Sequence, residues 1–305
     1  MTTAVTRAAL LARLVAVATL GAPGGALARP EHCLGTAQRQ WVIDETLIGV
    51  VNPEGFEHQL RVALCLPLIT RPGLLFDYTH FEVGLTDYLG PVYNHLGVYT
   101  SVDPLSFLQL RADAQGVVYW PLHFVDGAGY FALPGYTSRY ADDRLPDRAA
   151  RSAVGFNATL SATLRGAVDL TARVGLLVTS YFAGDFWYVG DSPYYVNLRR
   201  DVVLARSDWL LKSTTHLLVD VRLREGLGLH VGVTDDLTYV PRSGYLGNLI
   251  GGWVSLPIRR RARLREVEPF VRVGGYTHHA FRTTIDGGLQ LFGGLSVAWA
   301  WPGAR

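Results

Sequence analysis

The chain has 305 residues, and 49% of them are apolar. It carries 28 Lys and Arg against 26 Asp and Glu, so a strongly basic nucleic-acid-binding surface is excluded. Beyond the first 28 residues the sequence has no uncharged apolar run of about 20 residues, which argues against membrane-spanning helices. The apolar side chains of this chain must therefore be removed from water in another way. They could face lipid on the outside of a β-barrel, or they could fill the core of a large soluble β-structure.

The first residues have the order of a secretory signal peptide. Arg7 and Arg13 come first, and an apolar run over residues 14–22 follows them. An A-x-A cleavage site that ends at Ala28 comes last. The run is too short to span a membrane, and Pro23 interrupts it. We expect residues 1–28 to be removed by cleavage near Ala28 and the mature chain to be exported.

Two cysteines, Cys33 and Cys65, suit the oxidising compartment that export implies. They could form a disulfide that ties the start of the mature chain to an early strand. Two unpaired, buried thiols are the alternative, because spacing alone does not fix the geometry.

The first half of the mature chain contains several segments that alternate between apolar and polar residues. Residues 41–51 are ambiguous between a strand and a short amphipathic helix, and a Pro–Gly turn follows them. A tight turn at Asp103 and Pro104 is expected to separate two strands. Residues 115–153 break the alternation and are expected to form a long loop. The expected strands here cover residues 59–69, 80–89, 92–102 and 105–114.

The alternation is strongest in the second half of the chain. In the last segment, Leu295, Trp299 and Trp301 alternate with glycine, serine and alanine, so one face is large and apolar while the other is small. Such a pair of faces is typical of a strand with lipid on one side and a barrel interior on the other. The expected strands cover residues 154–164, 168–182, 208–223, 227–239, 249–259, 269–279 and 287–301.

The connections between these strands alternate in length. If the last strand ends in the periplasm, the two longest connections, near 115–153 and 183–207, lie outside the cell, and the turn at 165–167 lies inside. Counting residues 41–51 as a strand gives twelve strands, with ten or fourteen as alternatives. Aromatic residues near strand ends are expected to form interfacial girdles: Trp120, Trp187, Tyr188, Trp209, Tyr239, Trp253 and Trp299.

The leader, the amphipathic strands, the aromatic strand ends and the alternating connections together resemble a bacterial outer-membrane β-barrel of porin-like architecture. This resemblance covers about residues 58–301 and includes no specific family motif. It implies an all-β, transmembrane, antiparallel up-and-down barrel over residues 58–305 in the outer membrane of a Gram-negative bacterium. Residues 29–57 would be a periplasmic arm and first strand. Outer-membrane lipid, lipopolysaccharide and the barrel-assembly machinery would be its partners, and its oligomeric state is left open.

Charged residues cluster on the expected inward faces. The candidates for lining the lumen are Glu82, Arg173, Lys212, His216, Asp220, Arg222, His230 and Asp236. They could form a constriction or ligand site in a channel, or they could be paired charges that fill a narrow barrel. A basic run at residues 259–265 could bind anionic head groups, or it could be a solvated turn whose counter-charges are Glu266 and Glu268.

The sequence does not assemble a catalytic site. His216 and Asp220 share a strand face, but four residues span about 13 Å in a strand, and no inward serine lies beside them. We find no pattern for a metal or cofactor. The preferred function is a passive pore or a structural membrane protein of unknown substrate. The alternatives are an outer-membrane barrel enzyme of the lipid hydrolase or protease type, and a secreted soluble β-barrel binding protein.

Overall fold

A computed structural model describes Cys33, residues 38–52, 55–69, 79–122, 129–133, Gly135, and residues 150–259, 263–279 and 288–302. The expected signal peptide and its cleavage site lie outside these residues. In the parts that are described, no helix is both long and apolar enough to cross a membrane.

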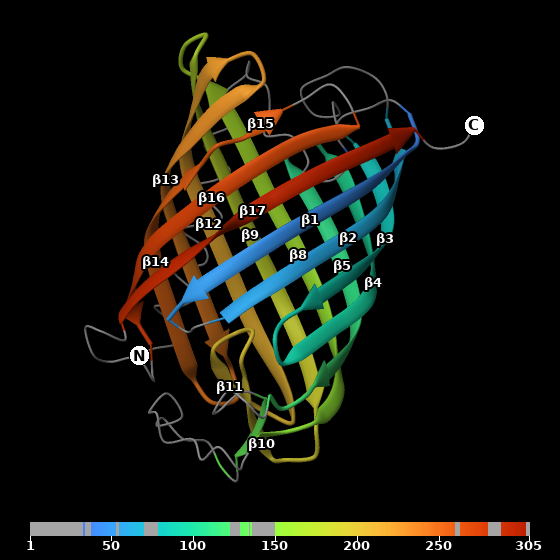
Figure 1. Cartoon of the computed structure of the whole chain (residues 1–305), viewed down its shortest axis with the longest axis vertical. Helices are drawn as coiled ribbons and strands as arrows, with labels where there is room; N and C mark the ends of the chain where they lie inside the picture. Colours follow the sequence, from blue (N-terminus) through green and yellow to red (C-terminus); the bar gives the residue numbers. More distant parts are fainter. Residues whose placement is uncertain are drawn as a thin grey trace.

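Twelve long antiparallel strands close into a barrel (Figure 1). β1 pairs with both β2 and β17, so the first and last strands of the chain complete the ring. The twelve are β1 (Gln40–Val51), β2 (Gly55–Pro67), β3 (His80–Leu89), β4 (Tyr93–Leu105), β5 (Leu108–Tyr119), β8 (Ala153–Asp169), β9 (Val174–Val189), β12 (Ser207–Arg224), β13 (Leu227–Val240), β14 (Tyr245–Ser255), β16 (Leu264–His278) and β17 (Leu289–Pro302). The prediction of an all-β, up-and-down barrel of twelve strands is confirmed, and the ambiguous segment 41–51 is strand β1.

The outward face of β17 is apolar and exposed, whereas the end of its inward face carries small, buried residues, as the alternation in the sequence predicts. Leu289 and Leu295 are 61% and 42% exposed, whereas Ala298 and Ala300 on the other face are 8% and 2% exposed. No layer of protein covers the exposed leucines in the described chain. The apolar side chains therefore point away from the barrel axis, opposite to their placement in a soluble barrel.

A small second sheet sits at one end of the barrel, which we call the lid end. It consists of β6 (Tyr130–Leu133), β7 (Ala150–Arg151), β10 (Tyr194–Asn197) and β11 (Val202–Ala205), in the order β11-β10-β6-β7. β6 and β7 belong to the region 115–153, which the sequence predicts to be a loop. In Figure 1, β10 and β11 lie at the lower end of the barrel.

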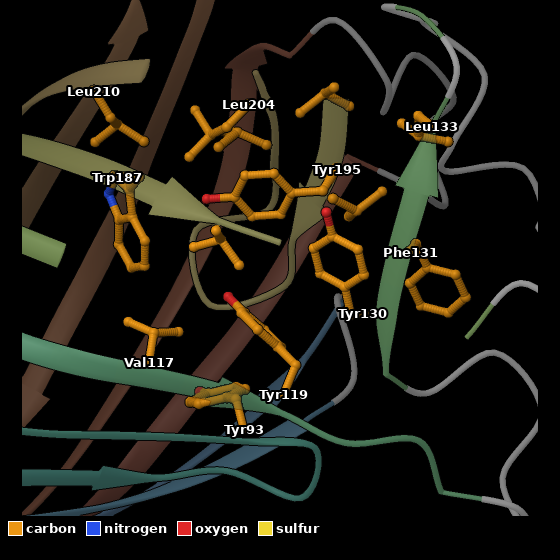
Figure 2. Close-up of a cluster of buried hydrophobic side chains, with 14 of the residues drawn as sticks. Tyr93, Val117, Tyr119, Tyr130, Phe131, Leu133, Trp187, Tyr195, Leu204 and Leu210 are labelled. Atoms are coloured by element: carbon orange, nitrogen blue, oxygen red, sulfur yellow. The ribbon is translucent and has the colours of Figure 1, made fainter. Parts of the chain in front are cut away.

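A buried apolar cluster fixes this lid sheet to the inside of the barrel (Figure 2). Tyr119 of β5 and Trp187 of β9 are fully buried and belong to the barrel wall, whereas Tyr130 and Tyr195 belong to the lid sheet. Three tyrosine rings connect the wall to the lid sheet. The ring centroids of Tyr119 and Tyr130 are 6.0 Å apart, and those of Tyr130 and Tyr195 are 5.5 Å apart. At this end the inward faces of the wall strands carry buried apolar side chains such as Val117 and Leu210, and this is where the lid packs.

Two turns differ from the sequence prediction. Residues 165–167 are part of β8, and the turn lies at residues 170–173, where the Thr171 hydroxyl accepts hydrogen bonds from the backbone N–H of Arg173 and Val174. Hydroxyl-to-backbone bonding of this kind stabilises a turn without glycine. The expected turn at Asp103 and Pro104 is also wrong, because β4 runs on to Leu105.

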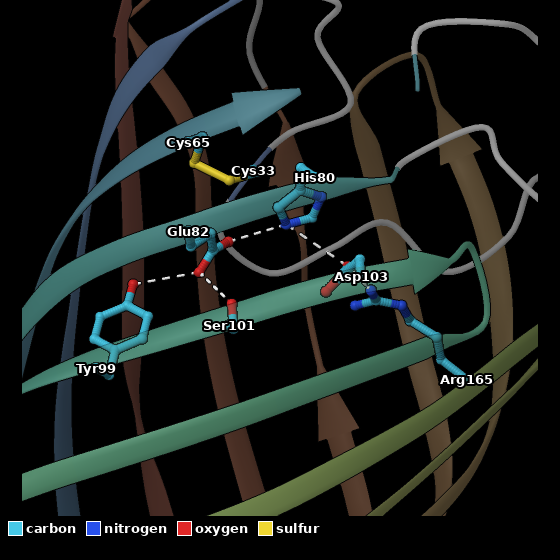
Figure 3. The surroundings of a disulfide bond; sticks show 8 residues. All are labelled: Cys33, Cys65, His80, Glu82, Tyr99, Ser101, Asp103 and Arg165. Atoms are coloured by element: carbon cyan, nitrogen blue, oxygen red, sulfur yellow. Dashed lines mark hydrogen bonds and ion pairs between the residues drawn. A yellow bond between two sulfur atoms is a disulfide. The ribbon is translucent and has the colours of Figure 1, made fainter. Parts of the chain in front are cut away.

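The opposite end of the barrel, the disulfide end, contains the disulfide between Cys33 and Cys65 (Figure 3). Cys33 and Cys65 form a disulfide with a Cα–Cα distance of 5.7 Å. Both are buried together with Val42 of β1 and Ala300 of β17. Cys65 is on the inward face of β2, so the disulfide holds Cys33 inside the barrel.

Candidate functional site: the barrel lumen

A cavity of about 1410 Å³ occupies the lumen, and side chains from all twelve long strands line it. At the lid end it reaches Val50 and Gly55, on either side of the turn between β1 and β2. Toward the disulfide end it reaches Gln109, the second residue of β5, and Arg165 of β8. The cavity therefore runs along most of the barrel axis.

A turn of the lid enters this cavity. Residues 198–201, which we call the constriction turn, join β10 to β11, and all four line the lumen. Arg199 makes a two-point contact with Glu57 of β2, with distances of 2.7 Å from Nε to Oε2 and 3.2 Å from Nη2 to Oε1. Its guanidinium also lies 4.1 Å from the ring centre of Tyr88. This residue anchors the turn to one side of the barrel.

Two further contacts anchor the constriction turn to other parts of the wall. Arg200 Nη2 is 3.1 Å from Asp185 Oδ2 on β9, and Asp201 Oδ2 is 3.3 Å from Nε2 of His279, just after β16. Asp201 has a φ of 52°, a left-handed conformation that aspartate tolerates better than most residues. The turn is thus held across the lumen by two ion pairs and by the contact between Asp201 and His279.

The contact between Arg199 and Glu57 is almost dry, since both side chains are only 11% exposed. Burial by itself would lower the pKa of Arg199, but the adjacent Glu57 carboxylate raises that pKa above its ordinary value. The guanidinium is therefore charged, and the Glu57 carboxylate offsets the cost of burying that charge in the lumen.

Three of the eight predicted lumen residues line the cavity: Lys212, His216 and Asp236. Asp236 pairs with Arg272 of β16, which also donates a 2.5 Å hydrogen bond to Gln290 of β17. Among the described residues Lys212 forms no ion pair, although the charge of Asp236 acts on it. Lys212 is thus a cation in the lumen without a direct counter-charge.

Three other predicted residues face inward but lie nearer the disulfide end and do not line the cavity. Asp220 Oδ1 is 3.4 Å from His230 Nε2, and Arg222 contacts both Asp169 and Asp220.

Arg173 does not face the interior of the barrel. It lies in the turn before β9 and is exposed, so the prediction that it lines the lumen is wrong. The cause is the misplaced turn, which put Arg173 inside a strand.

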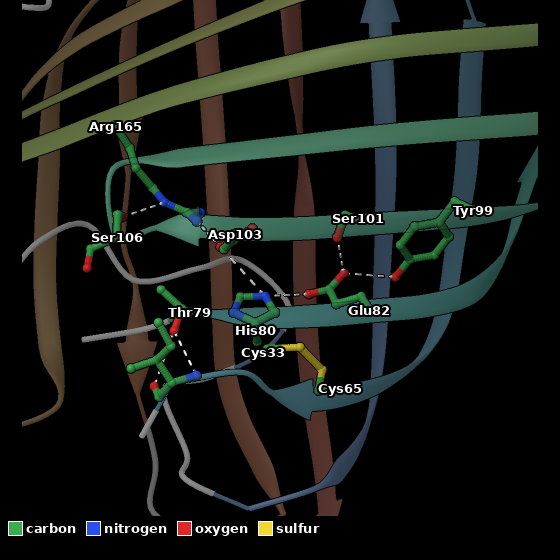
Figure 4. Close-up of polar contacts among 11 residues, drawn as sticks. Cys33, Cys65, Thr79, His80, Glu82, Tyr99, Ser101, Asp103, Ser106 and Arg165 are labelled. Carbon is green, nitrogen blue, oxygen red and sulfur yellow. Dashed lines mark hydrogen bonds and ion pairs between the residues drawn. A yellow bond between two sulfur atoms is a disulfide. The ribbon is translucent and has the colours of Figure 1, made fainter. Parts of the chain in front are cut away.

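Glu82 is fully buried in a polar network beside the disulfide (Figure 4). It accepts hydrogen bonds from Tyr99 and Ser101, and its Oε1 is 3.1 Å from His80 Nε2. His80 is also 3.6 Å from Asp103, which pairs with Arg165. At this end, paired polar groups fill the barrel. The two sulfurs and the Glu82 carboxylate lie within 4.8 Å of one another, but bonded sulfurs are not thiolate ligands for a metal.

Sequence reasoning missed a row of serine, histidine and aspartate across three strands. Ser255 Oγ lies 3.4 Å from His230 Nδ1, and Asp220 lies on the other side of the same ring. The three are register partners on β14, β13 and β12, so only strand pairing reveals them. All three are buried outside the cavity lining, and the surrounding backbone N–H groups belong to the sheet ladder.

Three aromatic side chains form a continuous inner strip that we call the aromatic ladder: Trp253, Phe270 and Phe292. The rings of Trp253 and Phe270 are 5.1 Å apart and nearly parallel, at 9°, and Phe270 is 5.6 Å from Phe292. The prediction that Trp253 and Trp187 belong to an interfacial girdle is wrong, since both point inward. Trp253 shares its face with Gly251 and Ser255, a pattern that identifies it as inward.

No protein-family model matches the chain, and no curated protein matches its sequence. Among solved structures, it is similar to the KdgM porin in complex with disordered oligogalacturonate, with 12% identity, coverage of 85% of this chain and 99% of that chain, and a TM-score of 0.32. It is also similar to the NanC porin, with 7% identity, coverage of 84% of this chain and 98% of that chain, and a TM-score of 0.38. A third similar structure is the outer membrane protein OprD from Pseudomonas aeruginosa, with 8% identity, coverage of 89% of this chain and 95% of that chain, and a TM-score of 0.29. At such identities and TM-scores, function has to be argued from the residues of this chain.

Proposed function

We propose that the protein is an outer-membrane β-barrel that acts as a passive pore for small hydrophilic solutes. The observation that carries this proposal is the cavity of about 1410 Å³ that runs along the barrel axis and is lined by all twelve strands. Seven Arg and Lys and four Asp and Glu are among its lining residues, so the path is suited to hydrated solutes. The constriction turn narrows this path and sets its size limit.

The outer surface supports the placement in a membrane. Large apolar side chains such as Leu289 and Leu295 are exposed on the outside of a closed barrel. Trp41 and Trp301 are paired on the outward face at the disulfide end, where an interfacial girdle is expected. We place the lid end outside the cell, because the two longest connections are there, and the disulfide end in the periplasm. Outer-membrane lipid and lipopolysaccharide then surround the barrel, which the barrel-assembly machinery inserts.

A liposome-swelling assay tests the pore. The refolded mature chain is reconstituted into liposomes, and the inflow of small neutral sugars of increasing size is measured. Swelling should be fast for the smallest sugars and fall with solute size, because the constriction turn limits the opening. Folded protein that produces no swelling at any size would leave a structural membrane protein as the better assignment.

Membrane placement also predicts a depth-dependent cost for a charge on the outer face. Leu295→Arg, in the middle of β17, should lower the free energy of unfolding in lipid by about 2–4 kcal/mol. Leu289→Arg, at the end of the same strand and on the same face, should cost about 0–1 kcal/mol. Urea titrations of both variants in the same vesicles measure the difference. Equal effects of the two changes would contradict this orientation of β17 across the membrane.

Lys212 should shift the ion preference of the pore toward anions, because it has no direct counter-charge in the described lumen. Lys212→Glu should therefore move the reversal potential in a salt gradient toward cations, with Lys212→Gln in between. Glu225→Gln, in the turn between β12 and β13, provides the control for a charge change outside the lumen. An unchanged reversal potential in Lys212→Glu would exclude this side chain from the ion path.

A further inference from the structure

Two exposed arginines lie on the barrel wall at the lid end, where β9 and β13 end and β12 begins. Arg206 directly precedes β12, and its guanidinium lies 4.9 Å from the ring centre of Tyr188 and donates a hydrogen bond to the hydroxyl of that residue. Arg242 lies in the turn after β13, and its Nη1 donates a 3.0 Å hydrogen bond to the backbone carbonyl of Ser207. The two guanidinium groups therefore lie on the two sides of Ser207, one toward β9 and the other toward β13.

Neither arginine forms an ion pair within the part of the chain that the structure describes. Their hydrogen bonds go to a neutral hydroxyl and to a backbone carbonyl. Asp208, two residues after Arg206, is buried and accepts hydrogen bonds from two backbone N–H groups. Another exposed arginine at this end, Arg151, is paired with Asp191. An exposed guanidinium without a carboxylate partner has N–H donors for an anion, and its planar fork fits the oxygens of a phosphate group.

Aromatic rings cover the outer face of the wall beside these arginines. Phe156 and Trp209 are 45% and 49% exposed. The ring centroids of Phe156 and Tyr188 are 5.8 Å apart, and those of Phe186 and Trp209 are 5.3 Å apart. All four rings face outward, since Trp187 between two of them points into the barrel. Such rings are typical of the border between the lipid core and water, so the two arginines lie at the level of lipid head groups.

The outer wall becomes shallow next to the aromatic rings. Ala114 of β5 and Ala158 of β8 are register partners, and Ala158 is in turn the partner of Phe186 on β9. Both alanines are on the outward face, and Leu160, the next outward residue of β8, is 66% exposed. Small side chains let an acyl chain lie close to the backbone of the sheet. The same stretch of wall therefore has cations at its edge, rings below them and an apolar hollow beside the rings.

We propose that this surface, which we call the rim patch, is a binding site for one lipopolysaccharide molecule. The guanidinium groups bind phosphate oxygens of its lipid A part, and the acyl chains cover the rings and the alanines. The inference rests on the proposed placement of the lid end outside the cell, because lipopolysaccharide is the phosphorylated lipid of the outer leaflet. The rim patch consists of Arg206, Arg242, Phe156, Phe186, Tyr188, Trp209, Ala114 and Ala158.

Native mass spectrometry of the refolded mature chain in a neutral detergent, titrated with lipid A, tests the site. The wild type should bind one lipid A in a saturable manner. Arg206→Gln and Arg242→Gln should each raise the Kd roughly fivefold, because each removes one cation near the membrane surface. The double variant should raise it roughly twentyfold or more. Lipid A without its phosphate groups should bind to the wild type as weakly as lipid A binds to the double variant.

Arg224→Gln is the matched control. Arg224 is also exposed and forms no ion pair in the described chain, but it ends β12 at the disulfide end of the barrel. This variant should keep the wild-type Kd, and heat-modifiable migration in a gel verifies that each variant is folded. An unchanged Kd in the double variant, or an equal rise in Arg224→Gln, overturns the rim patch.

Two further probes decide between sources of phosphate. Phosphatidylglycerol should bind more weakly than lipid A, and tighter binding of phosphatidylglycerol overturns the assignment to an outer-leaflet lipid. Inorganic phosphate at the concentration of lipid A should not displace it, because it lacks acyl chains, and displacement overturns a lipid as the occupant. Binding in detergent requires no ion current. A chain that conducts ions without binding lipid A overturns the rim patch alone, whereas a chain that binds lipid A without conducting overturns the pore alone.

Discussion

Glu57→Gln is expected to release the constriction turn from the lumen. The substitution leaves the buried guanidinium of Arg199 without its carboxylate, and breaking a buried ion pair in this way costs about 3–5 kcal/mol. The turn can avoid that cost by leaving the cavity, which lets Arg199 reach water. We therefore expect single-channel recordings of Glu57→Gln to show a larger conductance level, populated roughly a hundredfold or more above wild type.

The controls separate this effect from a general loosening of the lid. Asp191→Asn removes the partner of Arg151 in an exposed pair outside the lumen, which is worth less than about 1 kcal/mol. It should leave the conductance levels unchanged. The double variant Glu57→Gln/Arg199→Gln should be more stable than Glu57→Gln alone, because no charge is then left unpaired. Wild-type current levels in Glu57→Gln, or the same change in Asp191→Asn, would disprove the anchoring role of this pair.

The second large effect is expected at the disulfide. Cys33→Ser/Cys65→Ser removes a cross-link between residues 32 apart in sequence, which should lower the free energy of unfolding by about 3–4 kcal/mol. The same change frees Cys33 from the inside of the barrel, where it is buried in a cluster with Val42 and Ala300. We therefore also expect a higher conductance, because Cys33 is then no longer held inside the disulfide end of the barrel.

Reduction provides an independent route to the same state. Urea unfolding of the wild type with and without reductant should show the loss of stability, and reductant should have no further effect on the double variant. The Glu82 network beside the disulfide is a separate set of contacts and should still form. A shift of less than about 0.5 kcal/mol in both experiments would mean that the cross-link does not constrain the unfolded chain.

The barrel could be predicted from the sequence because its wall strands are long and one face of each meets lipid. In β17 large apolar residues such as Leu289, Leu291 and Leu295 recur at every second position except Gly293, so the period of a strand is clear. The lid sheet could not be predicted in the same way. β6 has four residues and β7 has two, too few to carry a period.

The candidate site was predicted only in part, for a similar reason. Lys212, His216 and Asp236 were placed in the lumen because alternation decides which face a residue takes. Alternation does not predict which inward residues are covered by other parts of the chain and so do not line the cavity. Glu82 is fully buried beside the disulfide of Cys33 and Cys65, and Arg199 comes from a turn with no period at all. Contacts between distant segments decide both cases.

The measurement that tests the pore most directly is the conductance of the folded, purified protein in a planar lipid bilayer. We expect discrete current steps that are ohmic and stable over time, with the Glu57→Gln variant showing larger steps than the wild type. Correct folding is verified beforehand by heat-modifiable migration in a gel. A folded protein that inserts into the bilayer and carries no current, either as wild type or as Glu57→Gln, would contradict a pore through this lumen.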